Sequence, residues 1–572
     1  MKTHLIICAI LLLAAGQARP VDRLELLPSN VHLRLDLPNV DHFADVIADS
    51  QIGRFWKDPE IRDFLGHPEI TALLPNLDAP EQQREILRKL QTEQLSLLRG
   101  EAAFGLNFGG TTDFYFVAGM PEPDYLQVVE IDRRIAELLP EKVTFLREKF
   151  QGTEILRTTR TDKNSTNVSW QAWARETLLE SSDRVWIEKT IAGLQAGAPR
   201  DALSNHLLRL RMDGAWLAEA LRKALAPDKP AGDTEAPAVF DQSRLVEALH
   251  INELQYVSFT LQGTAEKLES VTRLANNNSR RGIWSILDTN PLPVGLLLPV
   301  PAGVVSFSLD RLNLPGFWSE LPDAIARLDP NVAGGFQFFL GMLQQTFGID
   351  PENDILRHME TCYLSYGRLE KGRTSNLLCW RLKDPQLLKT TLRRLLTEGG
   401  PLRTALGDSL QEDEFLGQQL FTISQNAGDQ TAAWSLAVGG GHLLIGNPDM
   451  LREFLRALNN PAAGAAFQSS PLFRSLQRHT PPTAFAQSFF NLPVFLREFM
   501  TGPNWQTWRQ QWEAWRTKPE NKDHNWAKFD PARIPEPDKI AGFFGPLISH
   551  GRAVDGGVET TIILLPLAPE GW

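Results

Sequence analysis

The segment from Glu360 to Leu396 reads ETCYLSYGRLEKGRTSNLLCWRLKDPQLLKTTLRRLL, and its pattern predicts a β-hairpin followed by a helix. Two strand-like runs, Glu360 to Gly367 and Ser375 to Leu382, flank a polar, glycine-containing turn at Leu369 to Thr374. Asp384 then supplies a helix N-cap and Pro385 the first helical residue. The apolar residues that follow recur at the spacing of an amphipathic helix. They are Leu387, Leu388, Leu392, Leu395 and Leu396.

The segments after this helix continue the mixture of strands and helices. Two further strands are predicted at Gln418 to Ser424 and Ala432 to Val438. Three glycines, Gly439 to Gly441, then turn the chain into a strand at His442 to Ile445. Asn447-Pro448-Asp449 begins a second helix, which is predicted over Met450 to Leu458.

The first half of the chain repeats this order of elements about 260 residues earlier. The mixed strand pairs and helices, without a regular βαβα alternation, predict an α+β fold. We expect two similar lobes from an internal duplication, each with antiparallel hairpins packed by amphipathic helices. The matching elements are strands at Glu101 to Phe108 and Asp113 to Ala118, a helix near Glu130 to Leu139, strands at Glu154 to Thr159, Trp170 to Glu176 and Leu178-Leu179, and a helix from Ser182-Asp183.

A proline-rich stretch around Asn290 to Pro301 is the best boundary between the two lobes. The predicted domains are therefore a first α+β lobe over residues 19–290 and a second over residues 291–572. Each half ends in a late hairpin, at Gln255 to Leu274 and at Gly551 to Leu565. Ala226 to Ala238 is rich in proline and alanine and is expected to be a surface insertion.

The N-terminus has the order of a secretory signal peptide. Lys2 precedes an apolar run from Leu5 to Ala15, and small residues at Gly16 and Ala18 suit cleavage after residue 18. A buried first helix or a membrane anchor are the alternatives, but eleven apolar residues are about half of a ~20-residue span. The apolar stretch from Pro291 to Leu309 is interrupted by prolines. We expect a periplasmic or extracellular protein without a transmembrane segment after cleavage.

Leu26 to Leu65 reads LLPSNVHLRLDLPNVDHFADVIADSQIGRFWKDPEIRDFL and resembles the opening of a family of exported bacterial proteins, domain of unknown function 3352. Later pieces are similar to that family too: Leu382 to Pro385 before a helix, Gly417 to Phe421 as a strand, and Leu444 to Asn447 before a helix. The resemblance implies secretion and a repeated α+β architecture. It implies no catalytic residue, because the family has no accepted activity.

Composition excludes several classes of protein and site. The chain has 58 Lys and Arg against 69 Asp and Glu, a net charge of −11, which argues against a nucleic-acid binder. Its three cysteines are too few for a disulfide scaffold, a Cys₄ zinc site or a four-cysteine iron–sulfur cluster. The sequence contains neither Gly-x-Ser-x-Gly nor His-Glu-x-x-His. We therefore predict no catalytic, metal-binding or cofactor-binding residues.

Cys362 and Cys379 lie on the two strands of the predicted 360–382 hairpin. If the turn is centred near Glu370-Lys371, the two side chains are directly opposite and could form a cross-strand disulfide. Two buried free thiols are the alternative. A redox site is the third.

Tryptophans are concentrated in a helical insertion near residues 502–530. Trp505, Trp508, Trp512 and Trp515 follow the spacing of one helical face, after a start at Gly502-Pro503-Asn504. Such a stripe can pack the helix onto the second lobe. It can also form an exposed platform for sugar rings, a membrane interface or a protein partner.

Two function classes remain from the sequence. The first is a non-catalytic binding or structural protein of the cell envelope, working through the surfaces of its lobes with an unidentified envelope or extracellular partner. The second is a hydrolase of envelope or extracellular polymers with a carboxylate-based site, since glycosidases also lack short motifs. The absence of the motifs named above favours the first class, in which the protein is not an enzyme.

Overall fold

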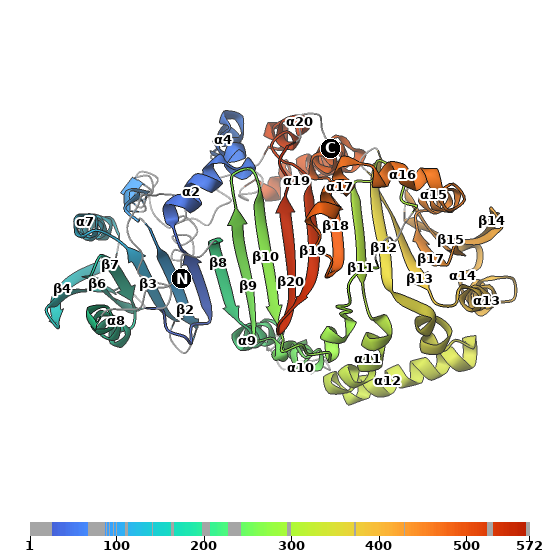
Figure 1. Cartoon of the computed structure of the whole chain (residues 1–572), viewed down its shortest axis with the longest axis horizontal. Helices are drawn as coiled ribbons and strands as arrows, with labels where there is room; N and C mark the ends of the chain where they lie inside the picture. The colour runs from blue at the N-terminus through green and yellow to red at the C-terminus, as the bar shows by residue number, and fades with distance from the viewer. Residues whose placement is uncertain are drawn as a thin grey trace. The chain divides into compact units, whose positions relative to one another are not determined.

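The computed structural model describes residues 26–66, 86, 89, 90, 92–94, 96–98, 100–108, 112–139, 141–161, 165–196, 206–226, 242–293, 299–370, 373–427, 430–522 and 530–567. The chain divides into two compact units, each of which combines antiparallel strands with helices. Figure 1 labels these strands and helices. The fold is therefore α+β, as the sequence predicts. Unit 1 comprises Met1–Asp213, Val257–Thr272 and Glu513–Pro535, and unit 2 comprises Gly214–Tyr256, Arg273–Trp512 and Glu536–Trp572.

Unit 1 contains an antiparallel sheet in which the strands follow the order β8-β1-β2-β3-β7-β6-β5-β4. Its strands are β1 (Leu33–Leu37), β2 (Ala102–Phe108), β3 (Thr112–Gly119), β4 (Lys142–Phe150), β5 (Thr153–Thr161), β6 (Thr166–Ala174), β7 (Thr177–Ser181) and β8 (His206–Asp213). The hairpin of β9 (Tyr256–Gly263) and β10 (Leu268–Ala275) follows later in the chain.

Helices cover both faces of this sheet because successive strand residues point to opposite sides. On one face, a row of fully buried side chains crosses five strands and packs against α8 (Arg184–Ala196). On the other face, apolar strand residues pack against α7 (Glu122–Leu138) and α2 (Val40–Asp49). The five-strand row is Ala103, Val117, Leu179, Ala172 and Ile155. The remaining helices of this unit include α3 (Gln51–Lys57) and α4 (Pro59–Gly66).

Unit 2 contains a longer antiparallel sheet, in the order β20-β19-β18-β11-β12-β13-β17-β16-β15-β14. Its strands are β11 (Ser306–Arg311), β12 (Met359–Glu370), β13 (Arg373–Leu382), β14 (Leu410–Phe415), β15 (Gln418–Ala427), β16 (Gln430–Gly439), β17 (His442–Gly446), β18 (Ala484–Phe490), β19 (Leu547–Val554) and β20 (Gly557–Leu564).

This sheet also has two covered faces. A five-strand row of side chains, each at most 1% exposed, packs toward α15 (Pro448–Leu458) and α17 (Pro471–His479). The opposite face packs against α13 (Pro385–Leu396). The buried row is Leu364, Cys379, Leu444, Ala437 and Leu420. Further helices are α9 (Gly214–Leu225), α10 (Leu245–Ala248), α11 (Leu314–Leu328), α12 (Pro330–Met342), α14 (Pro401–Leu406), α16 (Pro461–Gln468), α18 (Leu492–Thr501) and α20 (Pro537–Ala541), and α19 (Pro503–Arg516) begins in this unit.

The hairpin and helix predicted over residues 360–396 are confirmed as β12, β13 and α13. Asp384 caps α13 as expected, because its Oδ1 accepts the backbone N–H of Leu387 at 3.0 Å. Asn447 likewise caps α15, through the N–H groups of Asp449 and Met450. Strands β4, β8, β14 and β18 and the helices α9, α11, α12 and α18 have no counterpart in the sequence prediction.

Several predictions concern residues outside the described ones. The signal peptide at 1–18 is wholly outside them, and so is most of the predicted insertion at 226–238. The predicted boundary at 290/291 lies between β10 and β11, whereas unit 2 as defined by contacts also takes in residues 214–256 and 273–290.

Two adjacent leucines of α13 can test which side of this helix packs against the sheet. Leu388 is fully buried, whereas Leu387 is 45% exposed. Replacing Leu388 by Ala should lower the free energy of unfolding of unit 2 by about 3 kcal/mol, because it leaves a cavity against the sheet. Replacing Leu387 by Ala should change it by less than about 0.5 kcal/mol. Urea unfolding of both variants measures the difference, and equal effects would contradict the described orientation of α13.

Candidate functional site

Helix α18 and the residues of α19 up to Trp512, which belong to unit 2, carry an unusual set of aromatic side chains. Strand β18 ends at Phe490, and α18 begins two residues later with Pro493 near its N-terminus. Gly502 ends α18, and Pro503 begins α19 directly after it. This Gly-Pro break joins two short helices whose rings lie next to one another.

The rings form a continuous series, which we call the aromatic row. Its helical part starts with Phe495 and Phe499, which stack with centroids 5.4 Å apart. Phe499 lies 5.9 Å from Trp505, and Trp505 stacks on Trp508 at 4.7 Å. Trp508 then lies 5.5 Å from Trp512. The full row is Phe490, Phe495, Phe499, Trp505, Trp508 and Trp512.

The three tryptophans of the aromatic row are half-buried, and α19 has no buried residue. Three of the four tryptophans predicted to share a helical face therefore come together. Trp515 lies on the same helix and is also half-buried, and its backbone carbonyl accepts a hydrogen bond from Asn521 at 2.8 Å. Sequence reasoning missed the three phenylalanines, which come from the preceding strand and helix.

The disulfide predicted between Cys362 and Cys379 is wrong: both residues are free, buried thiols. The turn is centred one residue later than expected, so Cys379 pairs with Leu364 rather than with Cys362. The cysteines are diagonal neighbours, and diagonal strand positions are about 7–8 Å apart, beyond the normal span of a disulfide. Burial raises the pKa of Cys362 to about 11 and that of Cys379 well above its ordinary value.

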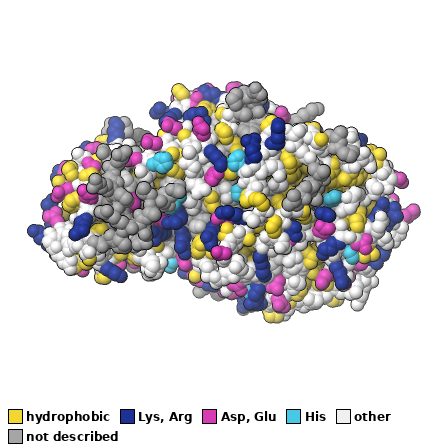
Figure 2. Space-filling model, in the orientation of Figure 1, with side chains coloured by type: hydrophobic (Ala, Val, Ile, Leu, Met, Phe, Trp, Pro, Cys, Tyr) yellow, Lys and Arg dark blue, Asp and Glu magenta, His cyan; other side chains and the backbone are white. Residues whose placement is uncertain are grey.

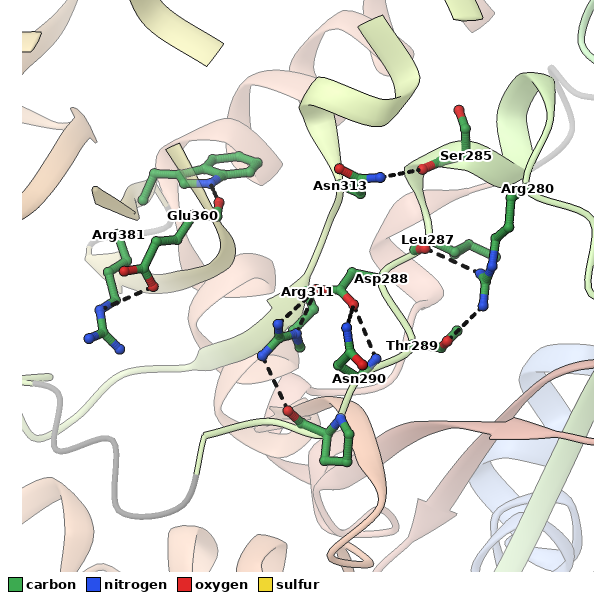
Figure 3. A network of polar contacts seen from close by, with 12 residues as sticks. Arg280, Ser285, Leu287, Asp288, Thr289, Asn290, Arg311, Asn313, Glu360 and Arg381 are labelled. Carbon is green, nitrogen blue, oxygen red and sulfur yellow. Dashed lines mark hydrogen bonds and ion pairs between the residues drawn. The ribbon is translucent and has the colours of Figure 1, made fainter. Parts of the chain in front are cut away.

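A buried ion pair of unit 2 lies near these thiols, since Arg311 is opposite Cys362 in the pairing of β11 with β12. Asp288 is 8% exposed, and Arg311 contacts its Oδ2 at 2.8 Å. Asn290 donates its backbone and side-chain N–H groups to Oδ1 of the same carboxylate. Figure 3 shows this cluster together with Arg280, which donates to the carbonyl of Leu287 and the hydroxyl of Thr289. The polar contacts hold residues 280–291 in place at the C-terminal end of β11, where Arg311 is the last residue.

The charge and hydrogen bonds of this cluster favour a structural role for Asp288. Burial alone would raise the pKa of Asp288, but hydrogen bonds from Thr361 and Asn290 and the guanidinium of Arg311 outweigh it and hold that pKa below its ordinary value. Both carboxylate oxygens are thus occupied. A carboxylate that is ionised and fully hydrogen-bonded has no free position for acid–base work on a substrate.

Two carboxyl groups of unit 1 have pKa values that are shifted in the opposite direction, upward. Asp132 on α7 accepts from Gln94 at 3.1 Å and from Gln171 on β6 at 3.3 Å. Burial raises the pKa of Asp132 to about 6, against the lowering effect of Arg160. Burial and the charge of Asp132 raise the pKa of Glu180 on β7 to about 7. Carboxyl groups whose pKa values are raised toward neutral pH are also a feature of acid–base catalysts.

Within the described parts of the chain, no three His, Cys, Asp or Glu side chains are grouped so that they could hold a metal ion. Nor does any helix among these residues combine the length and apolar character needed to cross a membrane. On the face drawn in Figure 2, Lys and Arg side chains are interspersed with Asp and Glu.

Comparison with known proteins adds little. No protein-family model matches the chain, and no curated protein matches it. Solved structures similar to parts of the chain include crystal forms I, IV and III of TP0453, at 9%, 10% and 10% identity. These matches cover 47%, 45% and 48% of this chain and 83%, 81% and 90% of the other, with TM-scores of 0.22, 0.24 and 0.23. Scores this low support no conclusion about fold or function.

The burial of Cys362 and Cys379 predicts how these thiols react with alkylating reagents. In the native protein neither Cys362 nor Cys379 should react with a thiol reagent at pH 8, because both are buried and protonated there. Both should react once the protein is unfolded without reductant. Mass spectrometry after alkylation counts the modified residues. If both thiols react in the unfolded protein only after a reductant is added, the two cysteines form a disulfide and the prediction is wrong.

The carboxyl pair of unit 1 predicts a pH dependence of stability. Because the pKa values of Asp132 and Glu180 are raised in the fold, the unfolded chain loses these protons first. Their contribution to stability should therefore fall as pH rises from about 4 to 7. The variant Glu180→Gln should gain about 1–2 kcal/mol relative to the parent across that range.

The difference between variant and parent is the useful measurement, because His206 of the same unit titrates with the opposite sign. Burial, with the charge of Arg209, lowers the pKa of His206 to about 4. Its contribution to stability therefore rises with pH and cancels in the comparison. Glu122→Gln, at an exposed position of α7, is the matched control for the replacement of a glutamate by glutamine. Denaturant titrations at several pH values measure all three proteins.

Proposed function

We propose that the chain is an exported, non-catalytic binding protein of the cell envelope that holds its ligand through the aromatic row of α18 and α19. The observation that carries the proposal is the half-exposed stack of Trp505, Trp508 and Trp512 on a helix without buried residues. Indole is costly to leave in water, and a row of such rings is typical of a contact surface.

The neighbouring side chains suit a ligand with both apolar and polar groups. Gln506 and Gln510 are exposed beside the indoles, and Arg509 is half-buried among them. Sugar rings combine apolar C–H faces with hydroxyl groups, so they match a surface of aromatic faces flanked by amides and a guanidinium. The proposed ligand is therefore a polysaccharide of the envelope.

We further propose that the architecture arose by internal duplication, with lobes at 19–290 and 291–572 and the 502–530 region as an insertion in the second lobe. The support is the pairing order of the strands. In unit 1 it is 8-1-2-3-7-6-5-4, and in unit 2 the same order recurs with each number raised by ten, as 18-11-12-13-17-16-15-14.

Helix caps recur at matching places and give independent support. Asn39 after β1 caps α2 through the N–H three residues on, and Asn313 after β11 does the same for α11. Asp183 and Asn447 each accept from the residues two and three positions later, at the starts of α8 and α15. In the described part of the connection between β8 and β9, no helix corresponds to α19.

Export and membership of the domain of unknown function 3352 family are also parts of the proposal. They rest on the N-terminal pattern and on the motifs between Leu26 and Leu65. Edman sequencing or mass spectrometry of the secreted chain tests export, since the mature protein should begin at residue 19.

The hydrolase alternative has one specific observation in its favour, the raised pKa values of the carboxyl groups of Asp132 and Glu180. Both oxygens of Asp132 already accept hydrogen bonds from glutamine amides, and α7 packs over this face of the sheet. A structural role for the pair is therefore the better interpretation. Release of soluble sugar from envelope polymer that is lost in Asp132→Asn would favour the enzyme instead.

Lipid-free envelope polysaccharide is the probe that tests the aromatic row. The parent protein should co-sediment with it, and the double variant Trp505→Ala/Trp508→Ala should bind at least about tenfold more weakly, because two stacked rings are lost. Trp434→Ala is the matched control, since this tryptophan is 57% exposed on β16 of the same unit. Equal binding by the double variant and the control would refute the proposal.

A further inference from the structure

Helix α12 of unit 2 is apolar but has no buried residue. Four of its large side chains are strongly exposed, Phe338 most of all at 75%. Scattered exposed apolar residues are normal on a protein surface, but a cluster on one helix indicates a contact surface. The other three are Phe339 at 46%, Val332 at 41% and Met342 at 38% exposure. We call these four residues the α12 apolar face.

The α12 apolar face is distinct from the face that holds the helix in place. At 100° per residue, Phe336 and Leu340 lie on one side of the helix together with Leu343 directly after it, and all three large side chains are half-buried. Phe336 contacts Trp318 of α11 with centroids 6.2 Å apart. The exposed residues occupy the adjacent side. The helix is therefore anchored by one apolar face and presents a second.

The remaining surface of α12 carries no charge. Between Asp329 and Asp350, none of the residues from Asn331 to Ile349 is charged, where the average composition of the chain would give about four. The third side of the helix is uncharged and is formed by Gly334, Gln337 and Gly341. A Cβ atom built on Gly334 or Gly341 would meet no other atom within 4 Å.

Helix α12 also projects from the unit. Its main packing partners are α11 and the π-helical turn Leu343–Phe347, which directly precede and follow it in the chain. Figure 1 shows α11 and α12 at the end of the unit 2 strands opposite to α16 and α17. Phe347 packs against the core of unit 2, so the turn that follows the C-terminal end of α12 is held in place.

We propose that α12 docks unit 2 on a lipid bilayer, lying in the membrane interface with its apolar face among the acyl chains. The composition of the segment favours this partner, because burying residues 331–349 in hydrocarbon would desolvate no charged side chain. A protein interface would be expected to have a polar, charged rim, which 19 uncharged residues do not supply. The thirteen residues of α12 span about 20 Å, so the helix lies in the interface and does not cross the ~30 Å hydrocarbon core.

The mechanism implies an unusual dependence on salt and lipid charge. Polybasic segments bind anionic membranes electrostatically and are released by salt. Binding through α12 depends on apolar area alone, and the chain has a net charge of −11. The parent protein should therefore float with vesicles of pure phosphatidylcholine, and raising the salt concentration should change the bound fraction by less than about twofold.

Vesicle flotation of variants tests the residues. Phe338→Asp/Phe339→Asp should bind phosphatidylcholine vesicles at least about tenfold more weakly, since the two aromatic side chains that would insert among the acyl chains become charged. Leu387→Asp is the matched control, because Leu387 is 45% exposed on α13 of the same unit, and it should bind like the parent. Both variants should keep the unfolding midpoint of the parent, because the replaced side chains are exposed.

A fluorescent label distinguishes the membrane from other occupants. Met342→Cys, labelled with an environment-sensitive dye while Cys362 and Cys379 stay buried, should shift its emission to the blue when vesicles are added. A shift without lipid that grows with protein concentration would assign the face to a second copy of the chain and overturn the proposal. So would flotation that survives Phe338→Asp/Phe339→Asp. Trp505→Ala/Trp508→Ala should float with vesicles like the parent protein. This variant therefore tests membrane binding by α12 separately from polysaccharide binding by the aromatic row.

Discussion

The fold depends on burying both faces of each sheet at once. In unit 2, Leu364, Cys379 and Leu444 belong to a row that crosses five strands with at most 1% of each side chain exposed. In unit 1, Ala103, Val117 and Leu179 belong to a row at the matching strands, equally buried. Side chains next to these rows along each strand point to the other face, so both faces need a helical cover. Helices α8 and α15 cover the rows, and α7 and α13 cover the reverse faces.

This constraint also explains the cysteines. Cys379 occupies the position in the unit 2 row that Val117 occupies in the unit 1 row, between a strand on each side. A thiol there acts as a small apolar side chain, and its raised pKa follows from the same burial. The sequence places both cysteines on the correct strands. It misses their register because a one-residue difference in the centre of the turn moves the opposite residue by two.

What the sequence predicts well is what local chemistry determines. Asp384 and Asn447 mark helix starts because their side chains accept backbone N–H groups a few residues on, a signal contained within one turn. Strands such as β18 are harder, because their pairing partners β11 and β19 lie far away in the chain. Helix α12 is missed for another reason. Two apolar faces and an uncharged third leave no polar stripe, so the amphipathic period that reveals α13 is absent from it.

The aromatic row shows a similar limit of sequence reasoning at a candidate site. Helical spacing connects Trp505, Trp508 and Trp512, but it stops at the Gly502-Pro503 break and cannot include Phe499 on the preceding helix. Only the angle between α18 and α19 extends the stack. The charged groups behave differently, since the best-paired ones face inward: Asp36 between Arg34 and Arg209 in unit 1, and Asp288 with Arg311 in unit 2. The charge of such a buried carboxylate is compensated by its guanidinium partners inside the fold and is not available for recognition. In both candidate surfaces of unit 2 the large exposed or half-buried side chains are aromatic and aliphatic, so contact area, more than ionic attraction, should govern what they bind.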